Sequence, residues 1–118
     1  MSYCINKIEG KIKFKKENSD IIVKTLSNKK FKWCDTFDYD EYVDDDIDIF
    51  EVFYNLRYDL IEEDNYYSIC DFLGDKYGED DIIFNTIAPH CENGYMKFRG
   101  EDGNTFKFII KDKQFKQK

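Results

Sequence analysis

A dense group of acidic side chains, which could bind a basic partner or a metal ion, lies between Asp35 and Glu51. This stretch places nine acidic side chains in seventeen residues and interleaves them with tyrosine, phenylalanine, valine and isoleucine. A disordered acidic tail lacks such aromatics, and an ordinary solvated surface intersperses lysines among its acids. The stretch therefore predicts a folded surface that uses its charge, in which carboxylates attract a basic partner and aromatic side chains hold it.

Residue types that serve catalysis do not combine into a site. His90 is the single histidine, and its neighbour Cys91 cannot face it, because consecutive residues on a helix or strand point apart. The four cysteines show no CxxC pair, which argues against zinc and favours reduced, buried thiols. Glu9-Gly-Lys11 has the Glu-x-Lys form of some metal nucleases, but no acid precedes Glu9 to complete a metal site. We expect no catalytic residue, no cofactor and no enzyme.

A calcium loop is the remaining metal hypothesis for the acidic stretch. Its first three alternate ligands are matched by Asp44, Asp46 and Asp48. The sixth position needs glycine for a sharp turn and is Ile49 instead, and the twelfth is Asn55 rather than glutamate. We therefore expect no bound metal.

Charge is distributed unevenly along the 118 residues. Nine lysines and three acids give residues 1–34 a charge of +6, whereas residues 35–81 carry eighteen acids against two bases, a charge of −16. Residues 82–118 return to +3. The negative charges of the central segment repel one another and lower stability. A function that uses the negative electrostatic potential of this segment is therefore worth proposing.

Alternating residues predict strands at both ends of the chain. Residues 7–15 place Ile8, Ile12 and Phe14 on one face and lysines on the other, with Gly10 marking a bulge. After an ENSD turn, residues 21–26 predict a second strand, and residues 30–34 could supply a third. Residues 94–111 form the clearest hairpin, joined by a GEDG turn, with lysine and arginine on its outer face.

The middle of the chain has mixed signals. Asp48 and Glu51 have the spacing of a helix cap, which favours a helix over residues 50–60, although alternation there also fits a strand. Residues 66–73 favour a strand, with a short helix as the alternative. A helix is expected from a cap at Asp80 or Asp81 to Pro89, with Ile82, Ile83 and Ile87 facing inward.

These elements predict a single α+β domain over residues 1–118. It has two layers: a mostly antiparallel sheet of about five to six strands, with two helices on one face and lysines on the other. The start of the chain lacks the apolar run of a signal peptide, and no segment has the length of a membrane span. We expect a cytoplasmic protein of a bacterial host that does not bind membranes. The sequence does not indicate its oligomeric state.

The terminal segment GYMKFRGEDGNTFKFIIKDKQF, together with IEGKIKF, resembles uncharacterised small proteins of phages and mobile elements that end in a similar GEDG hairpin. The resemblance covers about a third of the chain and carries no catalytic residue. Small size and acidity are also similar to anti-CRISPR proteins and other DNA-mimic inhibitors. The likeness implies a small acidic inhibitor of a host defence protein.

The resulting functional expectation is an inhibitor that occupies the basic nucleic-acid groove of such a host protein. The expected contact residues are Asp38, Tyr39, Asp40, Glu41, Tyr42, Asp44, Asp45, Asp46 and Asp48. An immunity protein that neutralises a toxin nuclease would use the same acidic residues to bind its partner. A different class of function is direct nucleic-acid binding by the lysine-rich sheet face, with Tyr95 stacking on a base. The negative total charge argues against that alternative.

Overall fold

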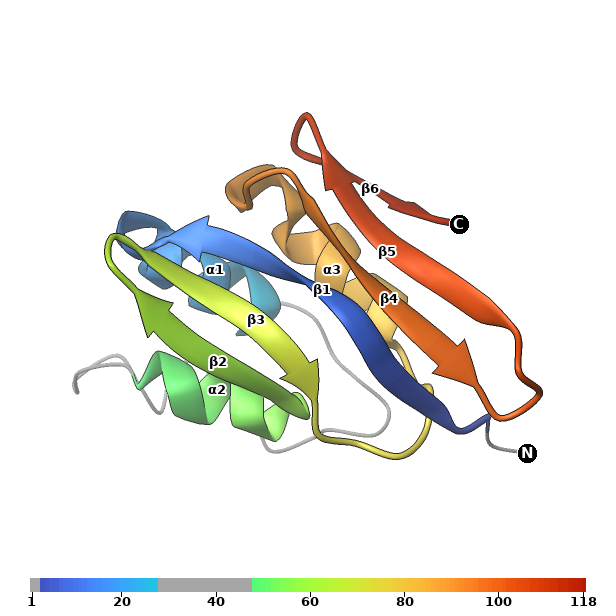
Figure 1. The fold of residues 1–118 in the computed structure, drawn as a ribbon. Helices are drawn as coiled ribbons and strands as arrows, with labels where there is room; N and C mark the ends of the chain where they lie inside the picture. Colours follow the sequence, from blue (N-terminus) through green and yellow to red (C-terminus); the bar gives the residue numbers. More distant parts are fainter. Residues whose placement is uncertain (1–2, 28–47) are drawn as a thin grey trace.

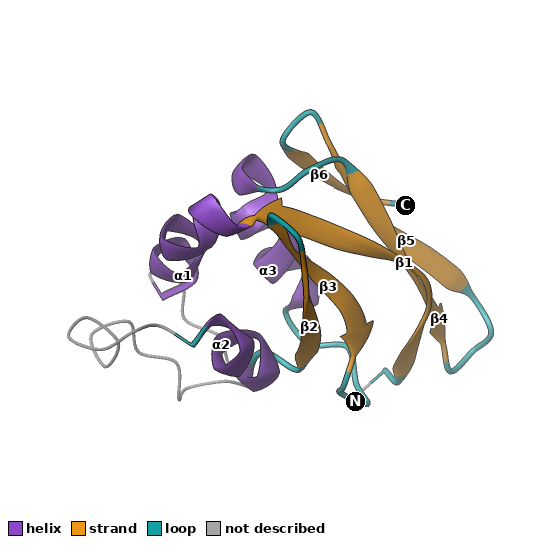
Figure 2. Ribbon diagram, turned by 60° about the vertical axis from the view of Figure 1, so that its left-hand side comes forward, coloured by secondary structure: helices purple, strands orange, loops and turns teal. Residues whose placement is uncertain are grey.

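The computed structural model describes residues 3–27 and 48–118, which form one six-stranded antiparallel sheet with helices on one side of it (Figures 1 and 2). In sheet order the strands are β2 (Tyr58–Glu63), β3 (Tyr66–Phe72), β1 (Ile5–Lys15), β4 (Gly94–Gly100), β5 (Thr105–Lys111) and β6 (Gln114–Gln117). The described helices are α1 (Ser19–Ser27), α2 (Ile49–Asn55) and α3 (Asp80–Ile87), with short 3-10 turns η1 (Lys16–Asn18) and η3 (Ala88–His90). The predicted two-layer α+β class is confirmed.

Strand β1 lies near the middle of the sheet and follows the predicted alternation in its second half. Ile12 and Phe14 are fully buried under the helices, while the intervening lysines face the open side. The predicted bulge is present, because the pairing with β4 shifts between Lys7 and Glu9 and Gly10 has a φ of +85°. Ile8, expected inside, is 40% exposed because it falls at this shift.

The predicted strand over residues 21–26 is wrong, since this segment is helix α1. Ile22, Val23 and Leu26 are fully buried, and this i, i+1, i+4 spacing is one stripe of a helix. The β-branched residues that suggested a strand are outweighed by burial of that stripe against the sheet. The adjacent ENSD segment lies within the 3-10 turn and the start of α1 instead of a hairpin turn.

Helix α2 begins at the predicted cap. The Asp48 carboxylate accepts hydrogen bonds from the backbone N–H groups of Phe50 and Glu51, at 3.0 and 3.3 Å. The helix ends at Asn55, not at residue 60, and Arg57 with a φ of 73° turns the chain into β2. The helical pattern of apolar residues therefore corresponds to α2, and the alternating pattern that follows it corresponds to β2.

Helix α3 begins at the predicted position but without the predicted cap. The residue that precedes it, Glu79, makes no capping hydrogen bond from its side chain, and Asp80 is the first helical residue, fully buried. Ile83 and Ile87 face the core as expected, whereas Ile82 is 38% exposed. Phe84 takes the inward position, with its ring centroid 5.2 Å from those of Tyr58 and Phe108.

Strand β6 was not expected from the sequence. It pairs with β5 through a two-residue turn in which Asp112 and Lys113 both have positive φ, of 53° and 63°. Phe115 of this strand packs on Phe108, with ring centroids 5.4 Å apart.

The buried apolar residues form one core between the sheet and the helices. The segment 30–34, for which a third strand was considered, lies outside the described residues. Within the described ranges, no helix is long and apolar enough to cross a membrane.

Candidate functional site

The acidic contact residues predicted from the sequence lie almost entirely outside the described part of the chain. This holds for Asp38, Tyr39, Asp40, Glu41, Tyr42, Asp44, Asp45 and Asp46. Asp48 is described, and it is exposed and caps helix α2. Its role in the fold is thus structural, and any test of the acidic surface must separate its charge from its capping.

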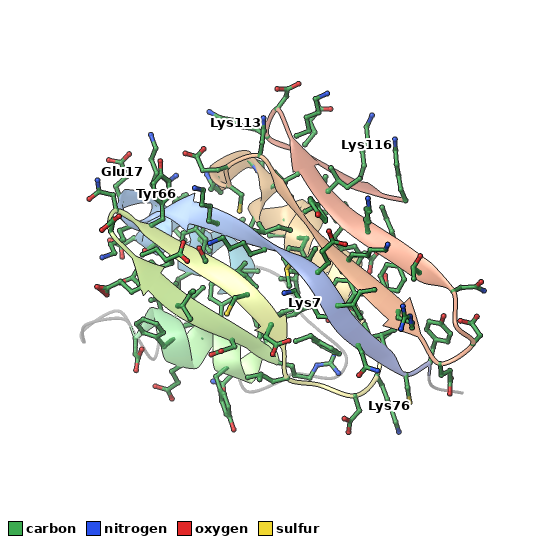
Figure 3. All side chains as sticks on the ribbon, viewed as in Figure 1. Lys7, Glu17, Tyr66, Lys76, Lys113 and Lys116 are labelled. Carbon is green, nitrogen blue, oxygen red and sulfur yellow. The ribbon has the colours of Figure 1, made fainter. Side chains whose placement is uncertain are left out.

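The open face of the sheet carries the predicted cations. On β1, β4 and β5 the side chains opposite to the buried ones are lysine or arginine at most positions. Strand β6 adds further lysines beside β5. We call the following set the basic face: Lys11, Lys13, Lys15, Lys97, Arg99, Lys107, Lys111, Lys116 and Lys118. Figure 3 looks onto this side of the sheet, with Lys116 at its β6 edge and Lys76 far from it on the loop after β3.

Three of these lysines form a row across adjacent strands. Lys97 of β4 lies directly opposite Lys107 of β5. Lys107 in turn exchanges two backbone hydrogen bonds with Lys118, at 2.7 and 2.9 Å. Like charges directly opposite each other destabilise a sheet. Glu9 of β1 lies directly opposite Lys97, but among the described residues no carboxylate forms a salt bridge with any of the three lysines.

The next row mixes cations with an aromatic and an apolar side chain. It runs from Lys11 through Tyr95 and Ile109 to Lys116, each opposite the next. The Tyr95 hydroxyl donates a hydrogen bond of 2.7 Å to Glu9, and this bond raises the pKa of the tyrosine. The Lys107 ammonium lies 5.1 Å from the centre of the Tyr95 ring. An aromatic ring is thus fixed in place among lysines.

At the β2–β3 end of the same face the lysines have partners. Lys11 forms a salt bridge of 2.9 Å with Glu63, which also accepts a hydrogen bond of 2.9 Å from Ser68. The Lys11 and Ser68 hydrogen bonds lower the pKa of Glu63. Lys13 lies over the Tyr66 ring at 4.5 Å. These contacts neutralise part of the charge, so the free cations concentrate toward β4, β5 and β6.

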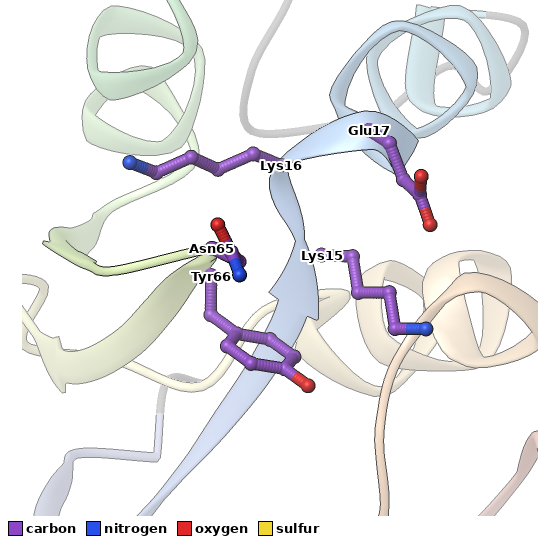
Figure 4. A pocket seen from close by; sticks show the side chains of 5 residues that line it. All are labelled: Lys15, Lys16, Glu17, Asn65 and Tyr66. Carbon is purple, nitrogen blue, oxygen red and sulfur yellow. The ribbon is translucent and has the colours of Figure 1, made fainter.

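A hollow of about 400 Å³ lies where β1 ends beside the β2–β3 turn. It is lined by Lys15, Lys16, Glu17, Asn65 and Tyr66. Figure 4 shows the two lysines pointing away from each other, and Lys16 forms a salt bridge of 3.1 Å with Glu62. The cations therefore do not converge on one ligand position.

The buried polar cluster around Asp80 has a structural role. Its carboxylate accepts hydrogen bonds from the Tyr58 hydroxyl at 2.7 Å, the Arg57 guanidinium at 3.1 Å and the Gly78 backbone N–H at 2.8 Å. Arg57 also donates to the carbonyl of Lys76 at 2.9 Å. Asp80 has no exposed surface that a substrate could reach. The cluster ties the start of β2 to the start of α3.

The other reactive groups do not form a site. Burial raises the pKa of the Cys91 thiol to about 12, which keeps it protonated and unreactive. The backbone carbonyl of His90 accepts a hydrogen bond from Asn18, and its ring is at a helix end. In the described ranges no group of three or more histidine, cysteine or acidic side chains could hold a metal ion. Cys34 lies outside those ranges.

No family model, no curated protein and no solved structure matches the chain. Function must therefore be argued from the surface itself. The sequence predicted the lysine face and Tyr95, but it missed the contributions of β6 and Ile109. The signal that could have found them is the alternation in QFKQK after the Lys-Asp-Lys turn.

Proposed function

We propose that the protein binds a single nucleic-acid strand across the basic face. The observation that carries the proposal is the pair of adjacent rows on β4, β5 and β6. One row contains three lysines that form no salt bridge with a described carboxylate, and the other holds Tyr95 and Ile109 between cations. Cations spread over several strands fit a polyanion better than a small anion, since no single point collects them.

A single strand fits this surface better than a duplex. Stacking on an aromatic side chain requires an exposed base, and sheets that bind single strands combine cations for the backbone with aromatics for the bases. Tyr95 is half-buried, and its hydroxyl is held by Glu9, so its ring is positioned before a ligand arrives. In a duplex the base faces are covered by their neighbours.

The negative total charge limits the affinity without abolishing it. Most of the acids belong to residues 35–81, while the region of β4, β5 and β6 is locally positive. Charges separated by more than the Debye length, about 8 Å at physiological salt, are largely screened. Local contacts therefore decide the binding, and we expect moderate affinity at low salt.

The test is a fluorescence anisotropy titration of labelled single-stranded DNA and RNA of mixed sequence, over a series of salt concentrations. The decisive variant is Lys97→Gln with Lys107→Gln, which removes two cations that form no salt bridge with a described carboxylate. The wild type should bind at low salt, and the variant should lose affinity. The slope of log K against log salt should become shallower by about 1.4, since each phosphate contact on a single strand contributes about 0.7.

The matched control is Lys76→Gln, which removes one exposed cation away from the basic face. It should leave both affinity and salt slope unchanged. Thermal unfolding should show that the double variant is as stable as the wild type or slightly more stable, because repulsion within the row is relieved. Failure of the wild type to bind any strand at low salt would refute the proposal.

A second candidate function follows from the acidic segment. A charge of −16 over residues 35–81 favours an inhibitor that binds a nucleic-acid-binding protein by occupying its basic groove. Under this hypothesis the protein is encoded by a phage or mobile element, and its partner is a host defence protein. An immunity protein that blocks a toxin nuclease would bind its partner through the same acidic segment.

Co-purification from host cells tests this candidate, since it identifies the partner directly. The charge reversal should cover Asp44, Asp45 and Asp46 but spare Asp48, whose loss would uncap α2. We expect the reversal to abolish binding to the purified partner. Tyr39→Ala and Tyr42→Ala should each weaken binding by about 2 kcal/mol if these side chains anchor the interface. Intact binding in all of these variants would exclude the acidic segment as the contact.

A further inference from the structure

Two hollows adjoin each other on the open face over the β4, β5 and β6 strands. Each has a volume of about 280 Å³, and they share Ile109 and Lys111. The first lies over β4 and β5 and the second over β5 and β6. Because they share lining residues, one ligand can extend from the first hollow into the second.

The first hollow has an apolar floor and a cationic rim. Tyr95 and Ile109 lie directly opposite each other and form the floor, and Lys107 and Lys111 lie on either side of Ile109 along β5. Two residues along a strand span about 6.8 Å, so each lysine is about one side-chain diameter from Ile109. Asn93 at the rim is fixed, because its side-chain carbonyl accepts a hydrogen bond of 2.9 Å from the Asp112 backbone.

The second hollow is dominated by cations. Its lining is Ile109, Lys111, Asp112, Gln114, Lys116 and Lys118. Asp112 is the carboxylate in that lining, and it lies in the β5–β6 turn at the end of the hollow. Its repulsion disfavours a phosphate at that end and leaves the three lysines as the anion-binding part.

We infer that the two hollows form one nucleotide subsite, in which an unpaired base lies on Tyr95 and Ile109 and its flanking phosphates contact Lys107 on one side and Lys111 and Lys116 on the other. This inference rests on the proposed nucleic-acid binding and adds where a base is held and along which direction the strand runs. The strand follows β5, since the cations alternate with the apolar floor along that strand.

The occupant follows from the chemistry of the lining. A flat apolar ring with an anionic group on each side matches an apolar floor with a cation on each side, and a nucleotide within a strand has that arrangement. An acidic peptide supplies anions but no planar group for the floor. A lone phosphate leaves Tyr95 and Ile109 uncovered. The Lys107 ammonium lies over the Tyr95 ring, 5.1 Å from its centre, so a base that stacks on this face displaces the ammonium toward the flanking phosphate.

The test compares an intact oligonucleotide with an abasic strand that has the same number of phosphates, in DNA and RNA forms. The wild type should bind the intact strand about fivefold or more tightly, the lower end of what one stacked base contributes. Ile109→Thr keeps a β-branched side chain but makes the Ile109 half of the floor polar while Tyr95 remains, and it should reduce this difference between the strands while leaving binding of the abasic strand unchanged. A larger difference in one form identifies that nucleic acid as the preferred ligand.

The control is Ile61→Thr on edge strand β2, an isoleucine 38% exposed on the open side of the sheet and separated from β4 by β3 and β1. It should preserve the preference for the intact strand. A second measurement needs no variant: a photoreactive thio-substituted base in the strand should crosslink the wild-type protein within residues 94–111. Crosslinks confined to other segments would overturn the subsite.

The failures of the two proposals are distinguishable. Equal affinity of the wild type for intact and abasic strands would refute the base subsite, while binding through phosphates on the basic face would stand. Absence of binding to both strands at low salt would refute the face and the subsite together. An unchanged preference in a folded Ile109→Thr protein would also refute the subsite.

Discussion

Asp80 is a carboxylate with no exposed surface, so its three hydrogen-bond donors decide whether it can remain there. Tyr58 is the most buried of them, and its hydroxyl lies 2.7 Å from the acid. Removal of one partner leaves a buried acceptor less satisfied, at a cost of about 1–3 kcal/mol. We expect Tyr58→Phe to lower the free energy of unfolding by this amount in denaturant titrations at neutral pH.

The same tyrosine gives stability a dependence on alkaline pH. Burial, followed by the charge of Asp80, raises the pKa of Tyr58 well above 10 in the folded state. Its contribution is complete below pH 10 and is lost as pH rises from there toward the folded pKa, because the unfolded state then releases the proton more readily. The free energy of unfolding should fall less steeply above pH 10 in Tyr58→Phe than in the wild type. Tyr54→Phe, at a 69% exposed position, should keep the wild-type slope.

Gly100 has no room for a side chain because Tyr3 packs directly against it. A Cβ atom added there would overlap the Tyr3 ring and hydroxyl, which donates a 2.5 Å hydrogen bond to Asp102 in the turn between β4 and β5. The ring would have to rotate away and lose this bond, so Gly100→Ala should cost about 1 kcal/mol. In a Tyr3→Ala background the same change should cost almost nothing. Additive effects in this double-mutant cycle would exclude the contact as the cause.

At the level of elements, helix α2 depends on its cap. Asp48→Ala removes the acceptor for two backbone N–H groups and should lower the free energy of unfolding by about 1 kcal/mol. Asp48→Asn removes the charge but keeps an equivalent capping oxygen, and it should retain nearly full stability. Chemical denaturation of the two variants checks this; equal destabilisation would mean that charge, and not capping, matters at this position.

The sequence predicted elements well where one period dominated. Strand β1 and the β4–β5 hairpin alternate lysine with buried apolar residues, so their type, their faces and the basic face followed directly. Helix α1 was missed because Ile21, Ile22 and Val23 suit a strand, and only packing reveals that Ile22, Val23 and Leu26 form a buried stripe. Propensity is local, whereas the burial that outweighs it depends on the whole fold.

Strand β6 and the hollows beside it show a different limit. The turn that creates β6 needs positive φ at both central residues, which Asn-Gly or Asp-Gly normally supply, and here Asp112 and Lys113 adopt it. Without a recognisable turn, the last strand could not be placed beside β5. The rows of side chains that cross β4, β5 and β6 depend on that placement, so the sequence identified the lysines but not their arrangement.

At the scale of the whole molecule, charges of like sign are gathered instead of interspersed. Lysines line the basic face and acids concentrate in residues 35–81. Only three ion pairs are described, and two of them are partly exposed. Exposed pairs contribute about 0–1 kcal/mol each, so repulsion within each group should outweigh them. The fold is therefore stabilised by its apolar core against a net electrostatic cost.

This balance predicts how stability responds to salt. Raising NaCl from about 0.01 M to about 0.15 M shortens the Debye length from about 30 to about 8 Å and screens the repulsion within both charge groups. The free energy of unfolding should therefore rise over this range, and it should rise less in the Lys97→Gln, Lys107→Gln protein, which has lost part of the repulsion. Lys76→Gln should follow the wild type. A fall in stability with salt would show that ion pairs outweigh like-charge repulsion. The row of Lys97, Lys107 and Lys118 would then not lower stability, and it would no longer argue for a bound anion.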